Sequence, residues 1–175
     1  MSHYISNYKP KYLLGRGGFG VVIESQNLID EKEYAVKIIK LPNKEDEKRK
    51  VLREVKHMAQ LEHRNIVTYL GTWFEYPTTI GWLDNLIKTH KLEEDESYNS
   101  VQYSQEDSNV SSQLGSEKES YLCIKMQLCE RKFLNNIIQE RNYEKKAIDH
   151  HECLQYFRDM LSAVKYIHKK QFIHR

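Results

Sequence analysis

Residues 14–22 read LGRGGFGVV, and this stretch decides the fold class of the 175-residue chain. Gly15, Gly17 and Gly20 have the GxGxxG spacing that lets a backbone approach phosphate with no Cβ in the way. A dinucleotide-binding fold needs such a loop to run from a strand into a helix. Here it runs into a β-branched stretch at residues 21–23, which favours a strand. We therefore predict a glycine loop between two antiparallel strands, with a tight hairpin that binds no ligand as the alternative.

The segment at residues 34–39 reads YAVKII and has the alternation of a strand. Strand side chains alternate between faces, so Ala35 and Lys37 share one face while Val36 and Ile38 share the other. A lysine within such an apolar strand needs an anion to balance its charge. Taken singly, Lys37 is more simply explained as an edge-strand lysine whose ammonium reaches water.

A charged stretch follows, and its apolar residues recur at helical spacing: Val51, Val55, Met58 and Ala59. We predict one helix with Asn43 as its N-cap and its end near Leu61.

Glu54 lies at the margin of the apolar stripe on this predicted helix, so we expect its carboxylate to look inward. A partly buried carboxylate is costly unless it is paired, and Lys37, 17 residues earlier, is the expected partner. Glu47 shares the stripe but lies in the first turn, where the helix dipole already favours a carboxylate.

Two further strands are predicted at residues 66–75 and 121–128, which are rich in β-branched, aromatic and other apolar residues. Between them, residues 91–120 hold eight serines and eight carboxylates, so an acidic, serine-rich disordered insertion is expected at about 85–120. After Cys129 the pattern becomes helical twice, and Asp149 followed by Glu152 has the spacing of a capping box. The prediction is an α+β fold with about five strands and one helix, followed by further helices.

Composition excludes several classes of function. A net charge of +2 is too small for a nucleic-acid footprint, and 30% charged residues indicate a soluble protein. Cys123, Cys129 and Cys153 form no CxxC pair, so neither a disulfide framework nor a zinc site is expected. No stretch approaches the roughly 18 apolar residues of a membrane span, so this segment is expected in the cytosol, although a longer protein could be anchored elsewhere.

The glycine loop, Lys37 and Glu54, in that order and spacing, resemble the N-terminal lobe of the protein kinases. The resemblance implies ATP as cofactor, with Lys37 on its α and β phosphates and Glu54 orienting that lysine. By the same resemblance Met126 is the gatekeeper, with a simple core methionine as the alternative. The ATP-binding residues implied are Leu14, Gly15, Arg16, Gly17, Gly18, Phe19, Gly20, Val21, Val22, Ala35, Lys37, Met126, Gln127 and Cys129.

The last residues, YIHKKQFIHR, resemble the approach to the kinase catalytic loop, with His174 and Arg175 as its first members. The resemblance places the N-lobe at residues 1–128 and the hinge with the beginning of the C-lobe at 129–175. It places the catalytic aspartate and the Mg²⁺ ligands beyond Arg175, so no metal ligand is expected within this chain and it is not expected to be active alone. A fragment of an active kinase is the leading hypothesis, and a non-catalytic short form that binds nucleotide or another kinase is the alternative.

Four stretches point to one kinase group: LGRGGFGVV, KVLREVK at 50–56, TWFE at 72–75 and KMQLCE at 125–130. They resemble the kinases of translation initiation factor 2 alpha, above all the endoplasmic-reticulum stress (pancreatic) and haem-regulated branches, which carry a charged insertion at the same place. The resemblance implies a serine/threonine kinase whose protein substrate is the alpha subunit of initiation factor 2, in the stress control of translation. It also implies a homodimer through the N-lobe.

Overall fold

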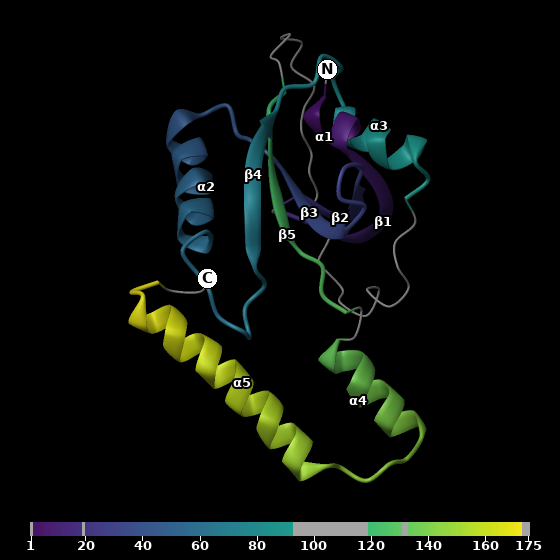
Figure 1. Ribbon diagram of the computed structural model, residues 1–175, viewed down its shortest axis with the longest axis vertical. Helices are drawn as coiled ribbons and strands as arrows, with labels where there is room; N and C mark the ends of the chain where they lie inside the picture. Colours follow the sequence, from purple (N-terminus) through teal and green to yellow (C-terminus); the bar gives the residue numbers. More distant parts are fainter. Residues whose placement is uncertain (1, 19, 93–118, 131–132, 173–175) are drawn as a thin grey trace.

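One antiparallel sheet forms the centre of the protein (Figure 1), and its five strands are β1 (Tyr8–Gly17), β2 (Gly20–Asn27), β3 (Glu33–Lys40), β4 (Tyr69–Glu75) and β5 (Tyr121–Gln127). Their order across the sheet is β1-β2-β3-β5-β4, and all neighbours are antiparallel. The structure, a computed structural model, describes residues 2–18, 20–92, 119–130 and 133–172. The α+β class and the five-stranded sheet are confirmed. β4 begins three residues after Ile66, the first residue of the strand predicted there.

Helices cover both faces of the sheet (Figure 1): α2 (Glu45–Met58) lies on one side, and α1 (His3–Asn7) and α3 (Trp82–Thr89) lie on the other. The predicted alternation in β3 is confirmed, because Val36 and Ile38 are fully buried in the core on the α1 and α3 side. The core on the α2 side is smaller, and its buried members are Leu41, Val55, Leu122 and Ile124.

The helix α2 was predicted from its apolar spacing and is confirmed, but its first turn differs from the prediction. Lys44, not Asn43, occupies the N-cap position, and its side chain makes no capping hydrogen bond. The first turn carries Glu45, Asp46 and Glu47 instead, whose charges interact favourably with the N-terminal end of the helix dipole. The helix ends at Met58, three residues before Leu61.

The buried carboxylate of Glu75, at the end of β4, fastens α1 to the sheet. It accepts hydrogen bonds from the backbone N–H groups of His3 at 2.7 Å and Tyr4 at 2.8 Å, and from the indole of Trp73 at 3.2 Å. The Tyr4 ring is fully buried, and its hydroxyl lies 2.7 Å from Ser25 Oγ. The segment before the glycine loop is therefore part of the core.

The helix α3 was not predicted, and residues 85–89 had been assigned to the disordered insertion. They are helical because Trp82 and Leu86 supply an apolar side that is buried against the sheet. Residues 90–92, 119 and 120 of the predicted insertion are also described, and Leu92 is buried in the core on the α1 and α3 side. The remainder, residues 93–118, lies outside the described residues.

Two helices follow the sheet, α4 (Leu134–Tyr143) and α5 (His150–Lys169). The predicted N-cap is confirmed, since Asp149 Oδ1 accepts hydrogen bonds from the N–H groups of His151 and Glu152. Glu152 does not complete the capping box, because its carboxylate binds Arg141 at 2.5 Å and the Tyr156 hydroxyl at 2.7 Å.

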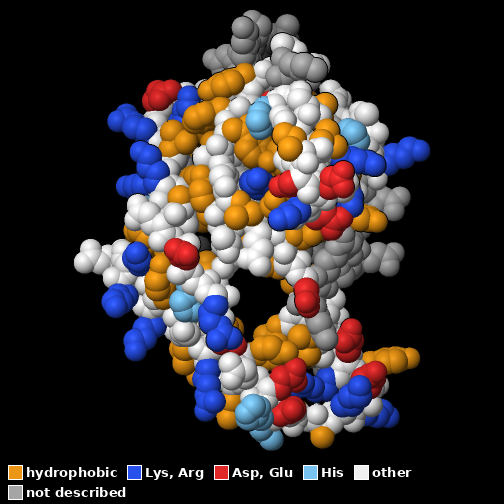
Figure 2. Space-filling model, viewed as in Figure 1, with side chains coloured by type: hydrophobic (Ala, Val, Ile, Leu, Met, Phe, Trp, Pro, Cys, Tyr) orange, Lys and Arg blue, Asp and Glu red, His pale blue; other side chains and the backbone are white. Residues whose placement is uncertain are grey.

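The helix α5 is joined to the loop between α2 and β4. The side-chain amide of Asn65 donates to the Asp159 backbone and carboxylate oxygens, both at 3.0 Å, and the Tyr166 hydroxyl accepts the Glu62 N–H. Much of the remaining α5 surface is apolar and exposed, and Figure 2 shows hydrophobic side chains around the hollow between the sheet and the C-terminal helices. None of the helices within the described ranges has the length and apolarity needed to cross a membrane.

Candidate nucleotide-binding site

The glycine loop is a hairpin that joins β1 to β2, as predicted, with Gly17 opposite Gly20. Gly20 has φ +112°, and a Cβ there would lie 2.2 Å from the Ile38 carbonyl oxygen. The close contact with β3 is therefore enough to require glycine at position 20, whether or not a ligand binds. A Cβ on Gly15 or Gly18 would meet nothing within 4 Å. The first half of the loop therefore leaves open space in which a ligand can approach the backbone.

Strand register brings the predicted nucleotide contacts together on one face of the sheet. Val22 of β2 lies opposite Lys37 of β3, and Ala35 of β3 lies opposite Met126 of β5. Directly opposed residues in an antiparallel sheet share a face. Met126 packs against the core beneath α2, so this nucleotide face, defined by Val22, Ala35, Lys37 and Met126, is on the α2 side.

Lys37 is half-buried at the centre of this face. Burial lowers the pKa of its ammonium, and the negative charge of Glu54 on α2 acts in the opposite direction. The expected electrostatic relation between the two residues is therefore present, but the expectation that Glu54 looks inward is wrong. Glu54 is exposed because the packed stripe of α2 runs through Val51 and Val55, and Glu54 lies on its border with solvent.

The end of β5 presents backbone groups beside the nucleotide face. The N–H of Gln127 donates to the Thr68 carbonyl at 2.9 Å, so the backbone group that Gln127 can offer to a ligand is its carbonyl. Cys129, two residues further on, is exposed. Leu14 is buried at an irregularity in β1 between Leu13 and Gly15.

Arg16 and Val21 belong to the loop but point away from the nucleotide face. They lie opposite each other on β1 and β2, and Val21 is part of the core on the α1 and α3 side. The Arg16 guanidinium lies 3.0 Å from Asp84 of α3. Three residues predicted for the site, Phe19, His174 and Arg175, lie outside the described residues.

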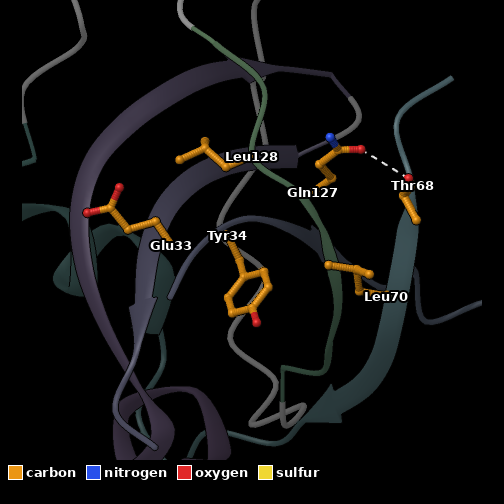
Figure 3. Close-up of a pocket in the computed structure, with 6 residues that line it drawn as sticks. All are labelled: Glu33, Tyr34, Thr68, Leu70, Gln127 and Leu128. Atoms are coloured by element: carbon orange, nitrogen blue, oxygen red, sulfur yellow. Dashed lines mark hydrogen bonds between the residues drawn. The ribbon is translucent and has the colours of Figure 1, made fainter. Parts of the chain in front are cut away.

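A surface cavity of about 420 Å³ lies where β3 begins and β5 ends (Figure 3), and its lining residues are Glu33, Tyr34, Thr68, Leu70, Gln127 and Leu128. Of the predicted nucleotide contacts only Gln127 lines it, and its side-chain oxygen accepts a hydrogen bond from the Thr68 hydroxyl at 3.0 Å. This cavity does not coincide with the nucleotide face. Within the described ranges, no cluster of three or more His, Cys, Asp or Glu residues is placed to hold a metal ion.

The sequence matches the family model of the protein kinase domain over residues 8–175. The chain belongs to the protein kinase family. The match includes every element from β1 to α5. It supports the expectation that the nucleotide bound by this domain is ATP.

Several relatives of this chain are named as kinases of translation initiation factor 2 alpha. It is 49% identical to eukaryotic translation initiation factor 2-alpha kinase 3 of Rattus norvegicus over 77 residues, which are 44% of this chain and 7% of that protein. It is 29% identical to eIF-2-alpha kinase GCN2 of Arabidopsis thaliana, over 99% of this chain and 14% of that protein. It is 32% identical to the interferon-induced, double-stranded RNA-activated protein kinase of Rattus norvegicus, over 93% of this chain and 26% of that protein. The kinase domain therefore spans a minor part of each relative.

Sequence reasoning missed two carboxylates on the side of the sheet opposite the nucleotide face. Glu75, which holds α1, is buried by residues about 70 positions earlier in the chain, and no local pattern marks such a contact. Asp84 of α3 contacts the glycine loop, and its helix fell partly within a stretch that composition marked as disordered. The apolar spacing of Trp82, Leu83, Leu86 and Ile87 was the available signal for that helix.

Proposed function

We propose that the nucleotide face binds ATP beneath the glycine loop. Val22, Ala35 and Met126 would contact the adenine, and the Gln127 carbonyl and the backbone of Cys129 would bind its edge. Lys37 would hold the α and β phosphates, with Glu54 orienting its ammonium. The observation that carries this proposal is the position of Lys37, a half-buried cation at the centre of that face, under the influence of the Glu54 charge.

The ammonium of Lys37 suits phosphate more than bulk water. Burial destabilises the charged form of Lys37 and lowers its pKa. An anion placed against this ammonium is therefore attracted more strongly than it would be by an exposed lysine. The backbone of Gly15 and Gly18 faces open space, so phosphate oxygens can approach it without meeting a side chain of either residue. Bound Mg²⁺ would neutralise charge on the phosphates, and by the kinase resemblance its ligands follow the His174–Arg175 pair.

We further propose that the protein transfers phosphate to serine or threonine hydroxyls in the alpha subunit of translation initiation factor 2, in the cytosol. The names of two relatives, from Rattus norvegicus and Arabidopsis thaliana, support this substrate. We place the boundary between the two kinase lobes after residue 128. Self-association through the N-lobe is part of the proposal, since β4 is an edge strand that exposes Leu70 and Phe74.

The test is a phosphorylation assay with the protein translated from the complete transcript, purified initiation factor 2 alpha subunit and radiolabelled ATP. The proposal expects labelled substrate, and it expects Lys37→Ala to abolish labelling without unfolding the protein. Lys9→Ala is the matched control, because Lys9 is an exposed lysine of β1 remote from the predicted contacts. Full activity of Lys37→Ala would refute the role of that lysine, and labelling of other proteins in preference to the alpha subunit would refute the substrate.

A further inference from the structure

The helix α3 packs firmly on the face of the sheet opposite the nucleotide face. Trp82 and Leu86 are buried there, and the Trp82 ring meets Tyr4 edge-on at a centroid distance of 6.2 Å and Tyr121 at 5.2 Å. Burying an indole and a leucine side chain removes a large apolar area from water, which stabilises the contact. The position of α3 is therefore fixed relative to β5.

A carboxylate just before β5 holds the first turn of the same helix. Glu119 accepts hydrogen bonds from the Gly81 N–H at 2.8 Å and from the Tyr121 hydroxyl at 3.0 Å, and it pairs with Lys40 of β3 at 2.5 Å. Burial acts to raise the pKa of Glu119, but these three hydrogen bonds outweigh it and hold the pKa below its usual value. Because Glu119 stays ionised at neutral pH, this attachment persists there.

From this fixed position α3 reaches the glycine loop. Asp84, in its first turn, lies 3.0 Å from the Arg16 guanidinium, and Arg16 is the residue between the first two glycines of the loop. Both side chains are a little over half exposed. An exposed ion pair of this kind adds little to the stability of the fold, but it is enough to shift the position of a hairpin tip.

We propose that Asp84 is a positioning residue for the glycine loop: by holding Arg16 toward α3, it keeps the loop in one position over the nucleotide face. The helix α3 and the segment that follows it then act on nucleotide affinity from the opposite face of the sheet. The part of this proposal that concerns affinity rests on the proposed function.

The test compares Asp84→Asn with a matched control in the 175-residue chain. The control is Asp46→Asn, which removes an exposed carboxylate from an ion pair with Arg49 on α2, far from the loop in sequence. Hydrogen exchange of the peptide that contains the glycine loop is measured without nucleotide, and the dissociation constant of a fluorescent ATP analogue is measured separately. We expect Asp84→Asn to speed exchange of the loop and to weaken analogue binding, each by about two- to fivefold. We expect Asp46→Asn to change neither.

A charge swap decides whether the pair itself is responsible. Arg16→Asp combined with Asp84→Arg restores the attraction with its direction reversed, so exchange of the loop should return toward that of the unmodified chain. Loop exchange that is the same in Asp84→Asn and Asp46→Asn would overturn the proposed positioning role of Asp84. Faster exchange with unchanged analogue affinity would overturn the proposed effect of α3 on nucleotide affinity. If the unmodified chain binds no analogue, the proposed function fails, and the exchange measurement still decides whether Asp84 positions the loop.

Discussion

The backbone of Gly20 rests on the carbonyl of Ile38, so closely that a Cβ at position 20 would lie 2.2 Å from that oxygen. Because Ile38 immediately follows Lys37, this contact sets how near the glycine loop can come to the lysine of the nucleotide face. The last glycine of the motif is thus required by the contact between β2 and β3, whereas Gly15 and Gly18 face open space.

Gly20→Ala should destabilise the fold, because the methyl group meets backbone atoms and φ +112° is strained for any residue with a Cβ. We expect a loss of roughly 2–4 kcal/mol in the free energy of unfolding, measured by urea denaturation. Gly18→Ala is the matched control, with an expected change within about 1 kcal/mol, since its methyl group enters open space. Equal effects of the two substitutions would contradict the assigned contact.

The three cysteines should differ in reactivity. Cys123 is fully buried and burial raises the pKa of its thiol, whereas Cys129 and Cys153 are exposed. Native alkylation with iodoacetamide, followed by mass spectrometry, should modify Cys129 and Cys153 and leave Cys123 intact. If Cys129 contacts adenine as proposed, ATP should slow its modification and leave that of Cys153 unchanged. Equal protection of both cysteines would argue against binding at the nucleotide face.

The stability of the first turn of α5 should depend on pH, because the Asp149 carboxylate caps this turn. The Glu152 N–H lowers the pKa of this carboxyl, and the His151 N–H adds to the effect. A carboxyl with a lowered pKa in the folded state stabilises the fold fully above its unfolded pKa of about 3.9 and loses that effect as pH falls through the lower folded value. Hydrogen exchange of the first turn of α5, divided by the intrinsic exchange rate at each pH, should show lower protection below pH 4.

Two substitutions separate the cap from other acid effects. Asp149→Asn keeps a side-chain acceptor that does not titrate, so the protection of this turn, taken relative to the intrinsic exchange rate at each pH, should stay constant through the acidic range. Asp149→Ala should lower that protection at neutral pH, where the carboxylate of the unmodified chain is ionised. The same acid response in the Asn variant as in the unmodified chain would show that another group titrates there.

Local patterns in the sequence were sufficient to predict the glycine hairpin, the alternation of β3 and the stripe of α2. Each depends on residues a few positions apart, and strand register then brought Val22 and Lys37 side by side as the motif order implied. The match to the protein kinase family supports the same assignment over residues 8–175.

Contacts between distant residues were not predictable in this way. Glu75 is satisfied by the backbone of residues 3 and 4, and residues 85–89 are helical because the sheet covers Leu86. The exposure of Glu54 has a similar cause: helical spacing places it at the border of the stripe, but only the packed structure decides on which side of that border it lies.

The measurement that tests the nucleotide face most directly is a titration of the 175-residue chain with ATP, followed by the chemical shifts of backbone amides. The account predicts shifts in the glycine loop, β3 and the end of β5, and at least roughly tenfold weaker binding by Lys37→Ala, because one charge-assisted contact to phosphate is lost. Lys9→Ala should bind as the unmodified chain does. Shifts confined to the cavity around Tyr34, or equal affinities of the Lys37→Ala and Lys9→Ala variants, would contradict it.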